Sequence, residues 1–325
     1  MSQQKDIYCD LGFWHSLSGK LSTAQLSPDL DDCRRIKTLL NWYGLICRSN
    51  MYFDCSVEDF DTASKDDLYL KSIWKRSTDG RCKLEFEENA ISKMLAGPEK
   101  MDFNMYNALF LTKDRHEVDS EKVGVISVSS NELFEHDELF CDNGLAIKKE
   151  DVVNWRSILE SAKVLHNCNA MVLVDNYAFE KAKYNLYEIL DTLLPKKLDA
   201  RFYLTIFFYN YGPERIIEDN EKALKAKIEE LRPDLSLTVE VFGITKNDFH
   251  DREIITNYMY VGIGSGFDLI SQRKTEKSTA LHAVYPMIIS EEESKWSKER
   301  YQIIINDAKK CLNKRGKSSK NRLLR

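Results

Sequence analysis

The sequence predicts an α/β protein built from two α/β domains. Its 325 residues fit one large or two medium domains. Short apolar runs, several followed by an acidic residue, alternate with amphipathic stretches, as strands and helices do in β-α-β units. A polar stretch over residues 131–151, with an Asp142-Asn143-Gly144 turn pattern, separates two such series. We therefore expect domains over residues 1–140 and 150–325.

The first domain has the shorter elements. We expect strands over residues 6–10, 107–112 and 124–129, and helices over residues 31–47, 68–76 and 88–95. The last helix ends before Gly97-Pro98, since proline cannot continue a helix.

The second domain has the more regular pattern. The expected strands span residues 170–174, 201–208, 237–242, 252–256 and 259–263, and the expected helices span 152–166, 179–194, 213–231 and 291–313. This order predicts a mostly parallel sheet that is flanked by helices on both faces.

The composition predicts a cytoplasmic protein. Hydrophobic residues make up 43% and charged residues 30%, and the net charge is −5, so the whole chain is not an obvious polyanion binder. No run of eighteen apolar residues is present, which argues against a membrane span, and the opening residues lack the pattern of a signal peptide. The eight cysteines are scattered without zinc-ligand spacing, so we expect reduced thiols.

The last seventeen residues, from Lys309 to Arg325, are strongly basic and contain no acid. Two interpretations stay open. The segment is either a solvated, frayed tail or a contact site for nucleic acid or an acidic partner.

One motif in the second domain contains candidate catalytic residues. His250, Arg252 and Asn257 are followed after six residues by Gly264-Ser265, and Phe267 stands two residues later. This spacing resembles the phospholipase D superfamily, which has H-x-K-x4-D and then G-S-x-N. The chain departs from the family with Arg for Lys, Asn for Asp and Phe for the final Asn.

The same segment, from His250 to Asp268, is even more similar to the phospholipase D-like C-terminal domain of MIT-domain proteins. That resemblance implies a lipid- or partner-binding module rather than an enzyme. The compatible α/β pattern extends the resemblance over roughly residues 155–325.

Phosphate chemistry suits these residue types. Alternate residues of a strand share a face, so His250 and Arg252 are expected to face one phosphate together. An imidazole can attack phosphorus or move a proton, and Arg offers a two-pronged donor for phosphate oxygens. We expect Gly264 and Gly266 to let backbone N–H groups approach the anion, with the Ser265 hydroxyl as a further donor.

The resemblance also implies that a catalytic site needs a second copy of the chain, and that a binding role is the alternative to catalysis. The family needs two half-motifs for each site and no metal or other cofactor, so activity at His250 requires a homodimer. Asn257 cannot stabilise an imidazolium by charge, which favours a binding role. A third interpretation is structural, with Arg252 paired to Asp268 or Asp251 beneath a glycine-rich turn.

Acids follow two strands of the first domain. Asp10 ends the first expected strand, and Asp114 follows the strand over residues 107–112. This pattern resembles the later part of PIN-like nucleases, which implies a Mg²⁺ or Mn²⁺ site with Asp10 and Asp114 as ligands that activates water against a phosphodiester. Strand-end acids are also common helix N-caps. Further acids that can join such a site are Asp54, Glu58, Asp59, Asp61 and Asp119.

These observations predict a nucleic-acid phosphodiesterase with catalytic residues His250, Arg252, Asn257, Ser265, Asp10 and Asp114. A role in prokaryotic defence follows by analogy from the pairing of two nuclease-like domains. The alternative is a non-catalytic adaptor that binds a partner protein or an anionic ligand.

Overall fold

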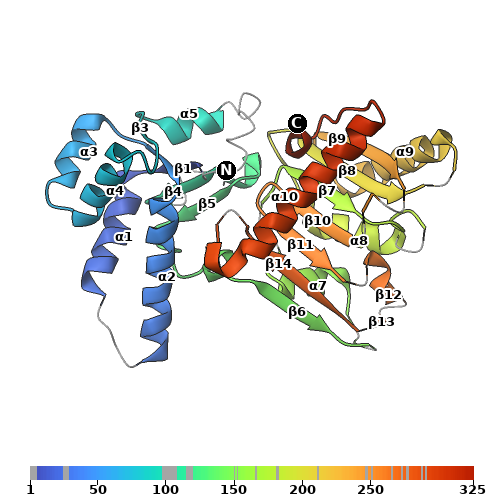
Figure 1. The fold of residues 1–325 in the computed structure, drawn as a ribbon, viewed down its shortest axis with the longest axis horizontal. Coiled ribbons are helices and arrows are strands. Elements are labelled where there is room, and N and C mark those ends of the chain that lie inside the picture. Colours follow the sequence, from blue (N-terminus) through green and yellow to red (C-terminus); the bar gives the residue numbers. More distant parts are fainter. Residues whose placement is uncertain are drawn as a thin grey trace. The chain divides into compact units, whose positions relative to one another are not determined.

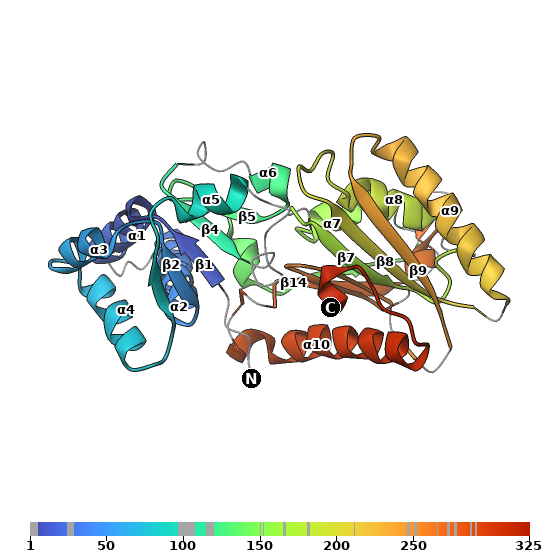
Figure 2. The same cartoon turned by 90° about the horizontal axis from the view of Figure 1, so that it is seen from above.

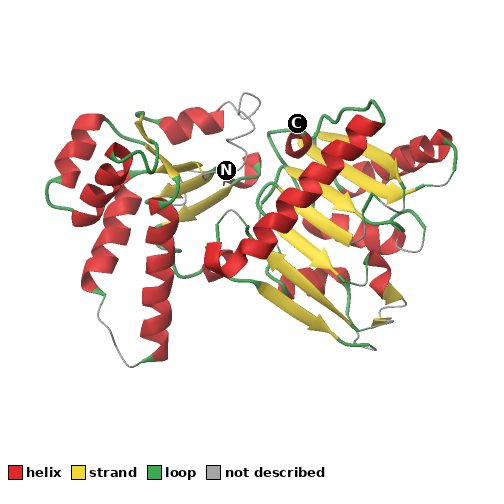
Figure 3. Ribbon diagram, viewed as in Figure 1, coloured by secondary structure: helices red, strands yellow, loops and turns green. Residues whose placement is uncertain are grey.

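The computed structural model describes residues 6–24, 29–96, 108–114, 120–149, 151, 153–164, 167–180, 183–210, 212–245, 248–249, 252–264, 266–271, 274–275, 278–286, 288–289 and 291–325. The chain divides into two compact units. The first comprises Met1–Phe140 with Ile288–Ser290, and the second comprises Cys141–Met287 with Glu291–Arg325. The predicted α/β class is confirmed, since each unit combines a sheet with helices (Figure 3).

The first unit is built on a five-stranded parallel sheet with the order β3-β2-β1-β4-β5 (Figure 1). Every neighbouring pair in it is parallel. The chain winds from β1 toward β3 on one side and then crosses to β4 and β5 on the other. The sheet therefore has a topological switch point between β1 and β4, where ligands of open parallel sheets commonly bind. The strands are β1 (Asp6–Cys9), β2 (Asn50–Phe53), β3 (Leu84–Phe86), β4 (Leu109–Thr112) and β5 (Ile126–Ser129).

Polar side chains cap the first turns of four helices in this unit. Asp10, Asp29, Ser56 and Asp67 each accept a hydrogen bond from a backbone N–H in the first turn that follows. The helices bury aromatic residues such as Phe13 against the sheet. The helices are α1 (Leu11–Thr23), α2 (Leu30–Cys47), α3 (Val57–Ser64), α4 (Leu68–Thr78), α5 (Ala90–Ala96) and α6 (Ser120–Val123).

The second unit contains a seven-stranded sheet with the order β6-β14-β11-β10-β7-β8-β9. Only β7, β8 and β9 run parallel, and the other four pairings are antiparallel, so the prediction of a mostly parallel sheet was wrong. A short turn joins β10 to β11, and so tight a connection forces antiparallel pairing. The strands are β6 (Asn143–Ile147), β7 (Ala170–Val174), β8 (Phe202–Tyr209), β9 (Leu237–Ile244), β10 (Arg252–Thr256), β11 (Tyr260–Ile263) and β14 (Thr279–Val284), with a separate hairpin of β12 (Ile270–Ser271) and β13 (Lys274–Thr275).

The expected turn at Asp142-Asn143-Gly144 is also corrected. Asn143 and Gly144 lie in β6, which pairs with β14 at the edge of the sheet. The partner strand comes from far along the chain, so the local sequence gave no indication of it.

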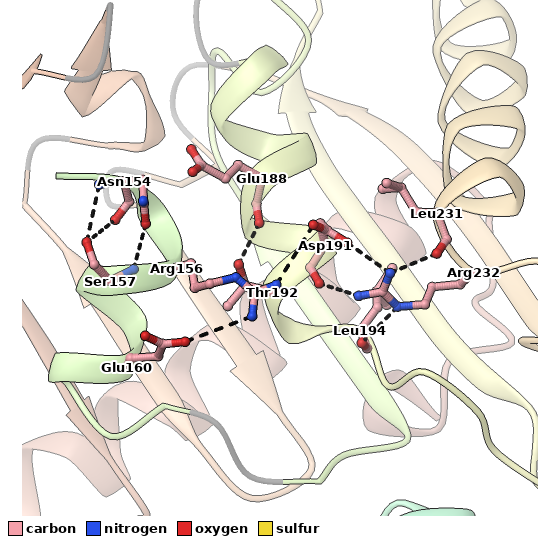
Figure 4. Close-up of polar contacts among 10 residues, drawn as sticks. All are labelled: Asn154, Arg156, Ser157, Glu160, Glu188, Asp191, Thr192, Leu194, Leu231 and Arg232. Carbon is pink, nitrogen blue, oxygen red and sulfur yellow. Dashed lines mark hydrogen bonds and ion pairs between the residues drawn. The ribbon is translucent and has the colours of Figure 1, made fainter.

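Helices cover both faces of the second sheet. The long helix α10 (Glu291–Lys314) crosses one face, whereas α7 (Trp155–Ser161), α8 (Lys183–Leu193) and α9 (Glu214–Leu231) lie on the other (Figures 1 and 2). Arg232 ties α8 to α9 where both end. Its guanidinium donates to the Asp191 carboxylate at 2.9 Å, to the Leu231 carbonyl at 2.8 Å and to the Leu194 carbonyl at 3.3 Å (Figure 4). These carbonyls would otherwise lack partners at the helix ends.

The basic C-terminal segment is not a frayed tail. Asn321 is buried, and its Nδ2 donates to the Met171 carbonyl at 2.9 Å and to Thr205 Oγ1 at 3.1 Å. A single 3-10 turn, η6 (Arg322–Leu324), then buries Leu323 and Leu324. The segment is therefore an integral part of the second unit, and the interpretation as a solvated tail was wrong.

None of the helices in the described ranges combines the length and the apolar composition that spanning a bilayer requires.

Candidate active site

Carboxylates gather at one edge of the first sheet. Asp10 directly follows β1, Asp54 directly follows β2, and Asp114 lies two residues beyond β4. These three strands are neighbours and run parallel, so their carboxyl ends share one edge. Backbone hydrogen bonds tie the strand ends together, from Asp54 N–H to the Cys9 carbonyl and from Asp10 N–H to the Leu111 carbonyl, both at 3.0 Å. The three acids therefore flank the switch point of the sheet. We call Asp10, Asp54 and Asp114 the carboxylate edge.

Asp10 is the most constrained member of the carboxylate edge. Its Oδ1 accepts from Phe13 N–H at 2.5 Å and caps α1, and its Oδ2 accepts from Lys113 N–H at 2.7 Å. Burial raises the pKa of Asp10, the two N–H groups lower it in part, and the charges of Asp54 and Asp114 raise it further. Each carboxylate oxygen has a second lone pair, so Asp10 retains the capacity to bind another group.

Asp54 and Asp114 differ in their freedom. The Asp54 carboxylate accepts from the N–H groups of Ala90 at 3.0 Å and Ile91 at 3.4 Å, at the start of α5. Asp114 is exposed, and its carboxylate accepts no hydrogen bond from another described residue. The edge thus combines two anchored acids with one that faces solvent.

Lys113 adds positive charge beside these acids. A Cβ atom at Gly12 would lie 2.8 Å from Lys113 Cδ, so glycine at position 12 makes room for the Lys113 side chain against the first turn of α1. Lys113 is exposed and immediately precedes Asp114. From the sequence, Asp54 was only one of five further acids that can join the site, and Lys113 was not predicted. The glycine at the start of a helix, after a strand-end acid, was the available indication of the close approach.

The edge has donor atoms that suit Mg²⁺ or Mn²⁺ but has no preformed coordination shell. Carboxylate oxygens are the ligands that these hard cations prefer. Within the described part of the chain, however, no three His, Cys, Asp or Glu side chains converge closely enough to hold an ion. Of the other acids considered, Glu58 and Asp59 lie in the first turn of α3, Asp61 is 3.9 Å from Lys65, and Asp119 lies outside the described residues.

The second unit brings Arg252 to a buried acid. Arg252 begins β10, which pairs antiparallel with β7 so that Arg252 lies beside Asp175, the residue after β7. Asp175 is 1% exposed and accepts from Phe267 N–H at 2.9 Å and Tyr177 N–H at 2.6 Å. Burial raises the pKa of Asp175, whereas the two N–H groups and Arg252 lower it.

Gly266 covers the Arg252 side chain. Gly266 has a φ of 86°, and a Cβ atom there would lie 3.3 Å from the Cγ and Nε atoms of Arg252 and from Oδ1 of Asp268. Arg252 Nε is buried without a hydrogen-bond partner among the described residues, and its Cζ lies 5.9 Å from the Tyr177 ring centroid. Arg252 therefore lies beneath a glycine turn, close to Asp268, as the structural interpretation expected. No ion pair between the two is found in the described residues.

The glycine N–H groups expected to bind phosphate are used inside the protein. Gly264 N–H donates to the Ala280 carbonyl and Gly266 N–H donates to the Ile263 carbonyl, both at 3.3 Å. These bonds close the turn after β11, so neither N–H is directed toward an external anion.

Asn257 does not join Arg252. It follows the last residue of β10, and its buried side-chain oxygen accepts from Asn169 N–H at 3.1 Å. A strand rises about 3.3 Å per residue, so five residues separate Asn257 from Arg252 by roughly 16 Å. The expectation that both line one anion position was wrong for this reason. His250, Asp251 and Ser265 lie outside the described residues.

No family model matches the chain, and a search of curated proteins finds no match.

Proposed function

We propose that the chain is a divalent-cation-dependent nucleic-acid phosphodiesterase whose active centre is the carboxylate edge. The observation that carries this proposal is the position of Asp10, Asp54 and Asp114 after three adjacent parallel strands. Several like charges at a switch point, one of them half-buried, favour the binding of a cation.

The residues of the edge have separable roles in this proposal. Asp10, Asp54 and Asp114 would hold Mg²⁺ or Mn²⁺, which supplies activation of water and neutralises charge on the phosphate. Asp10 and Asp54 are fixed by backbone N–H groups and set the position of the site. Lys113 attracts the phosphate backbone of a nucleic acid. Exposed Asp114 can move to complete the donor set.

The test is a cleavage assay with single-stranded RNA, single-stranded DNA and duplex DNA, in Mg²⁺, Mn²⁺ or EDTA. Cleavage is expected with a cation and is expected to stop in EDTA. Asp114→Asn removes one charge without disturbing a hydrogen bond of the described structure, and we expect it to lower the rate by at least about a hundredfold. The matched control is Asp32→Asn. Asp32 is an exposed acid in the first turn of α2 and is not a member of the carboxylate edge. Equal rates in Asp114→Asn and Asp32→Asn would overturn the assignment.

A second candidate function rests on Arg252. Its buried Nε and the adjacent Tyr177 ring favour a site for an anionic ligand or an acidic partner protein, without catalysis. A catalytic version requires the His250 residues of two subunits and therefore a homodimer. Cleavage that persists in EDTA and is lost in Arg252→Ala would favour this version, provided that light scattering finds a dimer.

The biological setting stays a proposal by analogy. A nuclease-like unit joined to a phospholipase D-like unit suits an effector of prokaryotic defence, in which one unit senses and the other cleaves. Toxicity on expression that is relieved by Asp114→Asn, but not by Asp32→Asn, would support this role.

A further inference from the structure

The second sheet ends on two edge strands, β9 and β6, and only the edge of β9 is covered. Val239 and Val241 of β9 are buried, and Val241 N–H donates to a Glu221 carboxylate oxygen at 3.4 Å. At the other edge lies β6, which pairs with β14 alone among the described strands (Figure 1). The sequence of β6 is Asn-Gly-Leu-Ala-Ile, which has no proline and no charged residue to oppose the addition of another strand.

The backbone groups of Gly144 and Ala146 point away from the sheet. Gly264 N–H donates to the Ala280 carbonyl, so the even-numbered residues of β14 bond to β11 and the odd-numbered ones bond to β6. Their partners in β6 are Leu145 and its odd-numbered neighbours. The N–H and C=O groups of Gly144 and Ala146 are therefore directed outward. Both residues are exposed, and these groups have no hydrogen-bond partner in the part of the chain that the structure describes.

The β6 edge is complementary to a second copy of itself. Two β6 strands can pair antiparallel in a register that is symmetric about Leu145, the middle residue of the strand. Gly144 of one copy would then lie opposite Ala146 of the other, and each such pair would exchange two main-chain hydrogen bonds. Their side chains are too small to obstruct the approach. On the opposite face Leu145, which is half-buried in the single chain, would contact its own copy across the two-fold axis.

The charges at the two ends of β6 also match in this register. Asp142 precedes β6 and Lys148 follows it, so each Asp142 would lie opposite the Lys148 of the other copy. Lys148 is exposed, and its side chain has no partner among the described residues. The Asp142 carboxylate lies 3.5 Å from His282 Nδ1 and is still 48% exposed, so it can accept from a second cation. A partner segment of a single charge sign would match only one end of this edge.

We propose that two copies of this chain associate through β6, which joins their second sheets into one continuous sheet across a two-fold axis. The interface consists of the two Gly144–Ala146 backbone pairs, the Leu145 contact and the two Asp142–Lys148 ion pairs. It is small, so the association is expected to be reversible and to depend on concentration. This proposal is independent of the function of the carboxylate edge.

The β6 dimer keeps the two Arg252 residues apart. β10, which begins at Arg252, lies three strand spacings from β6. Three spacings in each copy and one across the interface make seven, and at about 4.8 Å each they separate β10 from its copy by roughly 30 Å. Catalysis that pairs the His250 residues of two subunits therefore requires a different interface, which a dimer formed through β6 does not supply.

The direct test combines sedimentation analysis with hydrogen exchange at single amides of the wild-type full chain, at low and at high micromolar concentration. Leu145 N–H should be protected at both concentrations, because it bonds to β14. The N–H groups of Gly144 and Ala146 should exchange rapidly in the monomer and at least about tenfold more slowly in the dimer. A chain that is monomeric at every concentration, or a dimer in which both amides still exchange rapidly, would overturn the proposal.

An exchange of charges tests the register. Asp142→Lys and Lys148→Asp each place like charges opposite one another, so each should raise the Kd of the dimer about tenfold. An equimolar mixture of the two variants should recover association, because the mixed dimer restores both pairs of opposite charge. Lys149→Asp is the matched control, since it makes the same change of charge at an exposed residue that has no charged residue opposite it in this register. Failure of the mixture to recover, or an equal effect of Lys149→Asp, would contradict the register.

Ala146→Pro tests the backbone pairing. Proline removes the outward N–H of position 146 and breaks no bond to β14, and edge strands tolerate proline at such positions. Dimer formation should be lost, while Leu145 N–H keeps its protection. A variant that retains this protection and dimerises as wild type does would contradict strand pairing. If the variant loses the protection of Leu145, the charge variants and the amide exchange of the wild-type chain still decide the proposal.

Discussion

Asp10 and Asp114 in the first sheet and Asp175 in the second all follow buried strands, yet their surroundings differ. Asp175 is 1% exposed, accepts two backbone N–H groups and lies beside Arg252. Asp114 is exposed, and Asp10 is only half-buried, with two other acids near it. The parallel sheet thus gathers three acids at one edge, two of them held by backbone N–H groups. The mixed sheet has a single buried acid, which accepts from two backbone N–H groups and has the charge of Arg252 beside it. An acid at a strand end is therefore a structural anchor in one sheet and a candidate ligand in the other.

The largest expected difference between Asp175 and Asp114 is in their contribution to stability. Asp175→Ala leaves the Phe267 and Tyr177 N–H groups without their buried acceptor and removes the negative charge beside Arg252. We expect it to lower the free energy of unfolding of the second unit by about 3–5 kcal/mol. Asp114→Ala should change stability by no more than about 0.5 kcal/mol. Urea denaturation, read through hydrogen exchange of β7 and β4 amides, measures each unit separately. Similar losses of stability in both variants would contradict the conclusion that Asp175, but not Asp114, is a structural anchor.

A second prediction concerns Arg232, whose hydrogen bonds we expect to stabilise the second unit. Arg232→Lys keeps the charge but loses the fork that reaches Asp191, Leu231 and Leu194. We expect a loss of about 1–3 kcal/mol in the second unit. Arg215→Lys is the matched control, because Arg215 is 86% exposed and 3.8 Å from Asp219. A loss in the control as large as that in Arg232→Lys would contradict this role.

The pH dependence of stability should show the burial of Asp175. Burial raises the pKa of this carboxyl above its unfolded value, so the folded state binds more protons between the two values. We compare the free energy of unfolding of wild type with that of Asp175→Asn. The difference, wild type minus variant, should fall as pH rises from about 3.9, the usual pKa of an aspartate, to the higher pKa of Asp175 in the folded state. It should be constant at pH values well above that range. Urea denaturation at a series of pH values measures it, and a difference that rises with pH would contradict the assigned cause.

A small loss of stability is also expected for Asp10→Asn. Asparagine is also a good N-cap, so α1 keeps its cap, and the bond to Lys113 N–H is the one at risk. We expect a loss of about 1 kcal/mol or less in the first unit, together with loss of cation-dependent cleavage. If Asp10→Asn keeps full cleavage activity at temperatures where it is folded and loses activity only as it unfolds, Asp10 has a capping role alone.

Much of the fold could be predicted because its elements carry local patterns. The apolar runs of β4, β7 and β8 and the periodic stretches of α2, α9 and α10 were predicted close to their observed bounds. β2, β6 and β14 were missed. β2 has only four residues, and β6 and β14 owe their extended form to each other, across a long stretch of chain. Contacts of this range leave no local periodicity.

The candidate site residues could be predicted only where the order of strands in the sheet determines which residues lie together. Acids at the ends of neighbouring parallel strands meet for topological reasons, so Asp10 and Asp114 were predicted to share an edge and do so. Motif spacing does not fix which end of a strand a residue occupies, and Asn257 illustrates this. The strand over residues 170–174 was predicted, but the burial of Asp175 after it depends on Phe267 and Arg252, which come from distant segments.

The central claim is that the carboxylate edge binds a divalent cation, and the most direct measurement is a Mn²⁺ titration followed by the electron paramagnetic resonance of the free ion. We expect one tight site in wild type and in Asp32→Asn. The affinity for Mn²⁺ should be at least about tenfold weaker in Asp114→Asn and in Asp10→Asn. Arg252→Ala should bind as wild type does. Absence of a stoichiometric site in wild type, or equal affinity in Asp114→Asn, would contradict the claim.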